Sequence, residues 1–220
     1  MEIAIIGGTG KAGRGLAQRL AMAGHSVSIG SRDEERARAS ARELAAECDG
    51  DVDLRGVVNR DAVARCSVAF LSVPYAAHAD TLTELREALR DRTLIHLVIP
   101  LAPPRVTEVH LPPGQAAALE ARQLLDPSTA LVAALHHVGA EALAKRGADV
   151  DCDVLVCADD GAARDVAMAL LTEIGLRALD AGALRNAIAL EALTPVLLHL
   201  NRTYGAKACG IRVTGLPRRD

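Results

Sequence analysis

The sequence predicts an α/β protein built on a doubly wound parallel sheet, with a small α/β extension at its C-terminal end. Short apolar runs alternate with amphipathic helical patterns from the first residues onward, as repeated β-α-β units require. A glycine-rich turn, with glycines at positions 8, 10 and 13, separates the first apolar run from the first helical pattern. Together these two observations favour a Rossmann-type fold.

The first part of the chain shows the alternation most clearly. Five short apolar runs are expected to form strands, at residues 2–6, 26–30, 66–74, 93–100 and 130–136. Four segments between them space their apolar residues as one face of a helix does, at 11–24, 33–47, 77–91 and 115–124. The segment 101–114 contains four prolines and is predicted to be a loop.

The pattern continues after residue 137 with weaker signals. Strands are expected at 152–160, 176–182 and 210–215, and helices at 161–174 and from 183 to about 203. We therefore expect a nucleotide-binding Rossmann domain at 1–137 and a small C-terminal domain at 138–220.

The composition excludes several classes of function. A net charge of -3 argues against a general nucleic-acid-binding protein. We find no signal peptide, and the apolar stretch 188–200 is too short to span a bilayer, so no membrane contact is expected. The five cysteines include no C-x-x-C pair, which is typical of a reducing cytoplasm. No pattern of metal ligands and no Ser/His/Asp triad stands out.

The glycine turn has the spacing of a pyrophosphate-binding loop. Gly8 is expected to permit the tight turn, Gly10 the approach of the pyrophosphate, and Gly13 the close packing of the helix on the sheet. Free N–H groups at the start of the following helix attract an anion. Thr9 and Lys11 belong to the same loop, and all five residues are predicted to bind a dinucleotide.

The second predicted strand ends where such domains choose between NAD and NADP. NAD-preferring sites place an acid there, but this sequence has Ser31 and Arg32. A guanidinium pairs with the 2′-phosphate bidentately and a hydroxyl donates to it, whereas a carboxylate repels it. Arg36, one turn into the next helix, adds positive charge, and we predict NADP. Asp33 stays open as an NAD-type acid, although its position favours a helix cap.

Six segments spanning residues 2–216 carry a family resemblance: IAIIGGTGKAGRGLAQRLAMAGHSVSIGSRDEERA, LSVPYAAHADTL, VAALHH, DCDVLVCADD, LRALDAGALRNAIALEALTPVLLHLNRTYG and GIRVTG. In this order they resemble the NADPH-dependent reductases of the deazaflavin coenzyme F420, also called F420-dependent NADP reductases. The resemblance implies a reversible hydride transfer between NADP(H) and the deazaflavin. It also implies that residues 138–220 cover the deazaflavin cleft.

The resemblance also implies which residues contact each substrate. At the 2′-phosphate it adds Thr9 to the residues of the second strand and helix. Near the nicotinamide it implies Val73, Pro74, Tyr75 and His78, and at the deazaflavin His136, Val138 and Thr194. His136 and Thr194 are the predicted catalytic residues, because the reduced deazaflavin gains a proton and needs hydrogen-bonding groups around its ring.

Two other functions stay open at this point. One is an NADPH-dependent flavin or small-substrate reductase on the same scaffold. The other is a non-catalytic NADP-sensing protein, which would need the glycine loop but neither His136 nor Thr194. We also expect a homodimer, with the apolar helix at 188–200 as a candidate contact surface.

Overall fold

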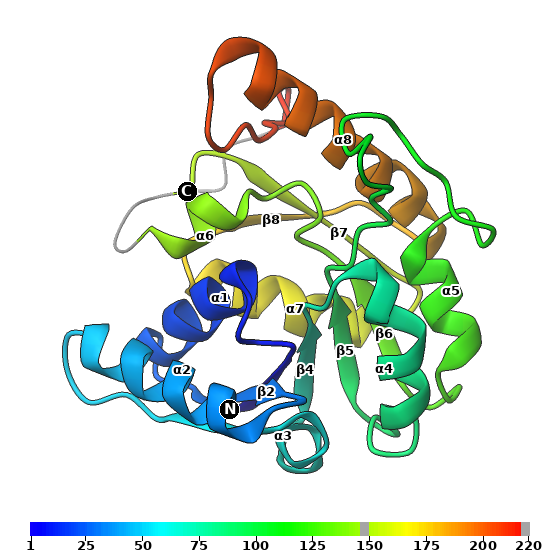
Figure 1. The fold of residues 1–220 in the computed structure, drawn as a ribbon. Coiled ribbons are helices and arrows are strands. Elements are labelled where there is room, and N and C mark those ends of the chain that lie inside the picture. Colours follow the sequence, from blue (N-terminus) through cyan, green and yellow to red (C-terminus); the bar gives the residue numbers. More distant parts are fainter. Residues whose placement is uncertain (146–149, 217–220) are drawn as a thin grey trace.

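A computed structural model of the chain describes residues 1–145 and 150–216 (Figure 1). In these ranges eight strands form one sheet in the order β3-β2-β1-β4-β5-β6-β7-β8. The strands are β1 (Glu2–Ile6), β2 (Ser26–Ser31), β3 (Leu54–Val58), β4 (Val68–Leu71), β5 (Thr93–His96), β6 (Ala130–Ala133), β7 (Asp153–Ala158) and β8 (Arg177–Asp180). The order of the first six strands is that of a doubly wound nucleotide-binding sheet, which confirms the predicted fold class.

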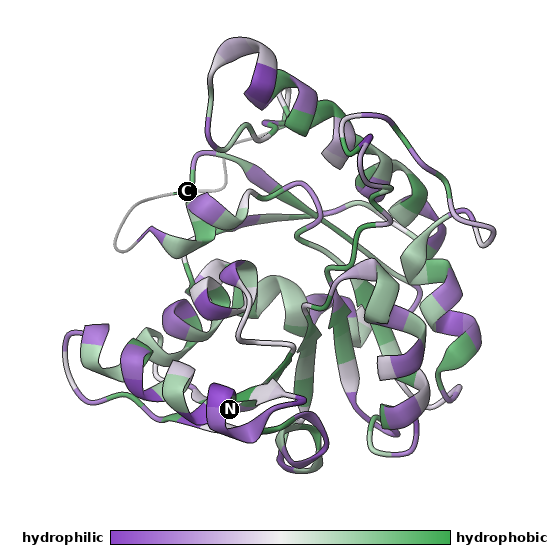
Figure 2. Cartoon of the chain, viewed as in Figure 1, coloured by the Kyte–Doolittle hydropathy of each residue, from purple (hydrophilic) through white to green (hydrophobic). Residues whose placement is uncertain are grey.

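Helices cover both faces of the sheet. They are α1 (Lys11–Met22), α2 (Glu34–Glu47), α3 (Asn59–Arg65), α4 (His78–Leu85), α5 (Ala117–Leu124), α6 (Ala140–Ala144), α7 (Gly161–Glu173) and α8 (Ala187–Tyr204), with short 3-10 turns η1 (Tyr75–Ala77) and η2 (Leu184–Asn186). Ile3 and Ile5 of β1 pack in a core with α1, α2, α6 and α7. Ala4 and Ile6 pack in a second core with α3, α4, α5 and α8. Figure 2 shows the resulting pattern of apolar strands between helices with polar outer sides.

The pairing of β7 departs from the parallel arrangement predicted from the sequence. All other neighbouring strands are parallel, but β7 runs antiparallel to β6. Only the last two residues of β7 pair with the end of β6, with Ala158 opposite Val132 and Cys157 opposite Ala133. The rest of β7, with β8 beside it, therefore extends beyond the carboxyl ends of the first strands, where α/β proteins bind ligands.

The predicted last strand at 210–215 is wrong. This segment runs beside the start of β7, where the Ile211 carbonyl accepts the N–H of Asp153 at 2.8 Å. The N–H of Val213 then donates to Oδ2 of Asp153 at 2.6 Å, so a side chain takes the place of a ladder partner. One backbone contact and one side-chain contact do not make a strand pair.

The prediction also missed β3 and α3. β3 lies at the edge of the sheet and is half-exposed, and it contains Arg55 and Gly56, so its sequence shows no apolar run. Other elements are shorter than predicted: β4 and β5 have four residues each, and the helix predicted at 77–91 is replaced by η1 and α4, ending at Leu85. The apolar residues beyond these strands instead line the cavities described below.

Candidate functional site

The predicted pyrophosphate loop connects β1 to α1. Its left-handed residue is Gly7, with φ of 70°. A Cβ on Gly8 would lie 2.8 Å from the Ile5 carbonyl oxygen, so the tight turn needs glycine at both positions. A Cβ on Gly13 would lie 2.7 Å from Cα of Gly8, which explains the glycine by close packing, as predicted. A Cβ on Gly10 would meet nothing closer than the Gly7 carbonyl oxygen at 3.7 Å. The outer side of Gly10 is therefore open to a ligand.

The start of α1 fits an anion. Gly10 is the N-cap, no side chain caps the helix, and its first turn contains no acidic residue. The first N–H groups of the helix are thus left for a ligand, and the helix dipole favours negative charge there. Lys11 beside them forms an ion pair with Glu141 of α6. A pyrophosphate group therefore fits the residues present.

A small cavity of about 240 Å³ lies next to this loop. It is lined by all four residues predicted to read the 2′-phosphate, namely Thr9, Ser31, Arg32 and Arg36. Sequence reasoning missed Asn59 in its wall, whose side-chain oxygen accepts the N–H of Gly7 at 3.2 Å. Asn59 begins α3, and that helix was itself not predicted.

Asp33, the alternative NAD-type acid, caps α2. Its carboxylate accepts the N–H of Arg36 at 3.1 Å, and its own N–H donates to the Ser31 hydroxyl at 3.2 Å. This confirms the predicted cap. The carboxylate is thereby held at the start of α2. Arg32 precedes it in the sequence and Arg36 follows one helical turn later, and both side chains are exposed.

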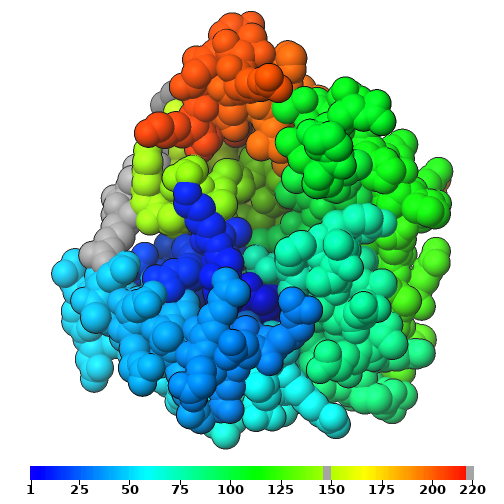
Figure 3. All heavy atoms as spheres, in the orientation of Figure 1, coloured from blue at the N-terminus to red at the C-terminus, as the bar shows by residue number. Residues whose placement is uncertain are grey.

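A second cavity, of about 590 Å³, adjoins the first. Both are lined by Gly10, Ser72, Val73 and Pro74, so the two cavities lie on either side of these residues. Figure 3 shows the surface hollowed where the N-terminal loop, α6 and α8 meet. Of the residues predicted to contact the nicotinamide or the deazaflavin, the larger cavity is lined by Val73, Pro74, Tyr75, His136, Val138 and Thr194. Its other walls are mostly apolar, and include Leu97, Val98, Ile99, Leu135, Leu143 and Leu197.

The chain turns sharply where β6 reaches this cavity. Leu135 has φ of 70°, a left-handed conformation that is unusual for leucine, and its carbonyl accepts the N–H of Val138 at 3.1 Å. The next carbonyl, of His136, accepts the Thr194 hydroxyl at 2.6 Å. Thr194 therefore donates its hydrogen to the backbone of the turn, and its oxygen is left to accept from a ligand.

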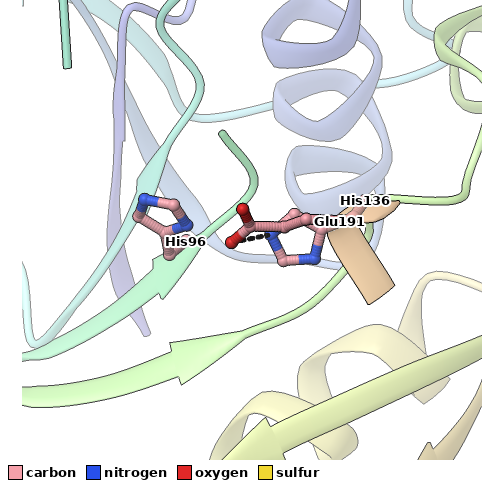
Figure 4. A group of neighbouring side chains, drawn as sticks. All are labelled: His96, His136 and Glu191. Atoms are coloured by element: carbon pink, nitrogen blue, oxygen red, sulfur yellow. Dashed lines mark ion pairs between the residues drawn. The ribbon is translucent and has the colours of Figure 1, made fainter. Parts of the chain in front are cut away.

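The His136 side chain is fully buried beneath the cavity wall. Its Nε2 lies 3.9 Å from Oε1 of Glu191, which α8 contributes (Figure 4). Burial lowers the pKa of His136 to about 3, so the ring is neutral at physiological pH. The cluster His96, His136 and Glu191 is formed by residues from β5, the turn after β6, and α8, and the sequence analysis singles out only His136 among the three.

Tyr75 lines the larger cavity, whereas His78 lies behind its wall. The Tyr75 hydroxyl donates to Glu120 at 2.8 Å, and burial together with this bond raises its pKa to about 12. His78 is buried and lines neither cavity; its Nε2 lies 3.0 Å from Nε2 of His96. Its predicted contact with the nicotinamide stays a prediction.

No helix in the described ranges has the length and apolar content needed to cross a membrane. Fold and site together define a Rossmann-type dinucleotide-binding protein with a second ligand cavity beyond its glycine loop. Residues 2–100 match the family described as NADP oxidoreductase, coenzyme F420-dependent.

Full-length relatives extend this match to the whole chain. The chain is 40% identical over 226 residues to the F420-dependent NADP reductase of Methanothermobacter thermautotrophicus, covering 100% of this chain and 97% of the relative. It is 37% identical over 223 residues to the enzyme of the same name from Methanocaldococcus jannaschii, covering 98% and 99% of the two chains. The chain belongs to the family of F420-dependent NADP reductases.

Solved structures show the same architecture. A crystal structure from Arthrobacter sp. FB24, given as a candidate F420-dependent NADP reductase, is 25% identical with a TM-score of 0.81, covering 97% of this chain and 99% of that chain. A pyrroline-5-carboxylate reductase from Coxiella burnetii is 16% identical with a TM-score of 0.61, covering 92% and 68%. The latter shares the fold.

Proposed function

We propose that this protein transfers a hydride reversibly between NADP(H) and coenzyme F420, both bound as substrates. The observation that carries the proposal is that two cavities with different chemistry lie next to each other and share lining residues. The smaller one is lined by two arginines and by hydroxyl side chains that include Thr9 and Ser31, which suit a 2′-phosphate. The larger one is mostly apolar with a few polar groups, which suits two stacked ring systems.

For hydride transfer the protein mainly has to align the donor ring with the acceptor ring. The donor and acceptor carbons must lie about 3–3.5 Å apart, and a cavity with apolar walls holds flat rings and excludes water. In this arrangement Val73, Pro74 and Tyr75 hold the nicotinamide, and Val138 and Thr194 hold the deazaflavin. Lys11 would exchange its ion pair with Glu141 for the phosphates when the dinucleotide binds.

The direct test mixes the protein with NADPH and oxidised F420 and follows the deazaflavin absorbance. Reduction of F420 with NADPH, and much slower reduction with NADH, is the expected result. Parallel reactions with FMN and FAD test whether the acceptor is a flavin instead. NADPH binding without reduction of any of these acceptors would contradict the proposal and favour a sensing role.

The proposal also covers the domain boundaries, the cellular location and the oligomeric state. Residues 1–137 form the NADP-binding part and residues 138–220 the part that covers the deazaflavin, as the position of α8 beside the larger cavity supports. We also propose a cytoplasmic protein, since all five cysteines are unpaired thiols. A homodimer is proposed with α8 at its contact, where Val196 is 44% exposed. Size-exclusion chromatography with light scattering tests this assembly.

A further inference from the structure

Glu191 is a carboxyl group buried inside the protein. Its exposed fraction is 2%, and it points from α8 toward the start of α5. There Oε2 accepts the N–H of Ala117 at 2.7 Å and Oε1 accepts the N–H of Ala118 at 2.9 Å. These bonds fix the carboxyl group in position, but N–H groups supply no full positive charge.

The side chains that face Glu191 carry no full positive charge. His136 faces it from the turn after β6 and His96 from β5, and burial lowers the pKa of both rings, so both are neutral near pH 7. Glu120 of α5 adds negative charge, and Tyr75 contributes a neutral phenol. Among the described residues no lysine or arginine pairs with Glu191.

Unpartnered nitrogens surround the carboxyl group. Neither ring nitrogen of His136 has a hydrogen-bond partner in the described structure, nor has Nδ1 of His96. The other nitrogen of His96 is 3.0 Å from His78. Figure 4 shows the rings of His96 and His136 on two sides of the Glu191 carboxyl group. If Glu191 were protonated, its O–H could donate a hydrogen bond to one of these ring nitrogens, which otherwise have no partner.

We propose that Glu191 holds the proton that accompanies hydride transfer and delivers it to the deazaflavin through His136. The inference rests on the proposed function and adds a proton source to it. It follows from a buried carboxyl group 3.9 Å from a neutral imidazole whose residue lines the larger cavity. Burial, with the charge of Glu120, raises the pKa of Glu191 to about 7, which makes the proton available near neutral pH.

The atoms and electrons of this step balance. A C–H bond of the dihydronicotinamide breaks, its electron pair forms a C–H bond on the deazaflavin, and NADPH becomes NADP⁺. The reduced deazaflavin then takes one proton at a ring nitrogen. Nε2 of His136 accepts the Glu191 proton while Nδ1 releases its own, which leaves Glu191 as a carboxylate that water later reprotonates. Because the His136 ring is covered, it must shift toward the bound deazaflavin for the last transfer.

The pH dependence of Glu191→Gln tests the proposal. In the parent, single-turnover reduction of F420 by NADPH should slow as pH rises through about 7, because the protonated form of Glu191 is lost. Oxidation of the reduced deazaflavin by NADP⁺ should accelerate over the same range. The amide of Glu191→Gln keeps an acceptor for α5 but has no transferable proton. Reduction at about pH 6 should fall about a hundredfold and lose this pH dependence.

Glu173→Gln is the matched control. Glu173 also pairs with a histidine, at 2.8 Å from Nε2 of His25, but lines neither cavity of the site. This variant should keep the parent rates and the parent pH profile. NADPH affinity, measured by titration, should be unchanged within about twofold in both variants, because neither residue lies on the glycine loop.

Three results would overturn the proposal. A Glu191→Gln variant with the parent pH profile shows that another group supplies the proton. If that variant fails to fold, the parent is measured instead. Equal reduction rates of the parent in H2O and D2O, together with no pH dependence, would also show that Glu191 does not supply the proton. The third is a stoichiometric zinc ion retained by the parent and lost from Glu191→Gln, since donor atoms of His96, His136 and Glu191 lie within 4.8 Å of one another. Absence of F420 reduction by the parent at every pH would instead contradict the proposed function itself.

Discussion

The two ends of the site are built in opposite ways. The four residues predicted to read the 2′-phosphate lie within one short stretch of chain, Thr9 to Arg36, and the two guanidiniums among them are exposed. The redox end joins residues far apart in the sequence, among them His136 and Thr194, and both of these are buried. An exposed charged side chain selects a ligand by the sign of its charge. The protonation and orientation of a buried polar group depend instead on the residues around it. The first end should therefore change its selectivity on substitution, and the second its rate.

The largest expected effect is on the loop that both ends share. Gly10→Val places a branched side chain on the open side of the glycine, where the pyrophosphate would approach. Overpacking of this kind costs about 3 kcal/mol, so NADPH affinity should fall at least about a hundredfold. Calorimetric titration with NADPH measures the loss, and thermal unfolding should show a largely intact fold.

Gly161→Val is the control for this substitution. A Cβ at Gly161 also meets nothing closer than 3.7 Å, but it lies at the start of α7, away from the loop. It should bind NADPH as the parent does. Normal NADPH binding by Gly10→Val would show that the pyrophosphate does not approach the loop at Gly10.

At the redox end, His136→Ala and Thr194→Ala should slow deazaflavin reduction or weaken its binding about 10- to 1000-fold. His136→Ala removes the imidazole, and Thr194→Ala removes the 2.6 Å hydrogen bond that holds the turn containing Leu135. NADPH affinity should barely change. Single-turnover kinetics alongside NADPH titration separate the two effects.

Thr172→Ala is the matched control for the threonine. Its hydroxyl also donates to a backbone carbonyl, that of Met168 at 2.8 Å, but on the exposed side of α7. The control should reduce F420 at the parent rate. If His136→Ala and Thr194→Ala also do so with parent affinity, the deazaflavin ring lies elsewhere.

At the phosphate end, Arg32→Asp should weaken NADPH at least about tenfold and NADH far less. The change replaces a phosphate donor with a repelling charge, and a hydrogen bond to a charged group contributes about 1.5–3 kcal/mol. Arg42→Asp changes the net charge equally from an exposed position on α2 outside the small cavity, and should leave both affinities unchanged. Equal losses for both dinucleotides would show that Arg32 does not read the 2′-phosphate.

The sequence predicted the two ends with different success. The glycine loop, Ser31, Arg32 and Arg36 were identified by local spacing, because a motif within one β-α-β unit determines its own geometry. Asn59 was missed because β3, the edge strand before it, has no apolar run. The positive φ of Gly7 was missed because the motif counts only the later glycines.

The redox end needed the tertiary structure. Resemblance to a family suggested His136 and Thr194, but no local pattern places Glu191 beside His136, since the two residues are 55 positions apart in the sequence. Their protonation depends on burial, which spacing does not reveal. The antiparallel direction of β7 likewise does not follow from its own apolar residues, which suit a parallel or an antiparallel partner.

The smallest expected effect concerns Asp33, and it tests whether this residue only caps α2 or also selects the dinucleotide. Asp33→Ala removes the acceptor for the Arg36 N–H at 3.1 Å and should lower the free energy of unfolding by about 1 kcal/mol. Asp33→Asn keeps a good N-cap without the charge, so most of this stability should remain. Neither variant should change the ratio of NADPH to NADH affinity by more than about twofold, because the carboxylate is held at the end of α2. Denaturant unfolding and paired titrations measure both quantities. A selective loss of NADH affinity in Asp33→Asn would show instead that this acid reads the ribose, and that NADP preference rests on the arginines alone.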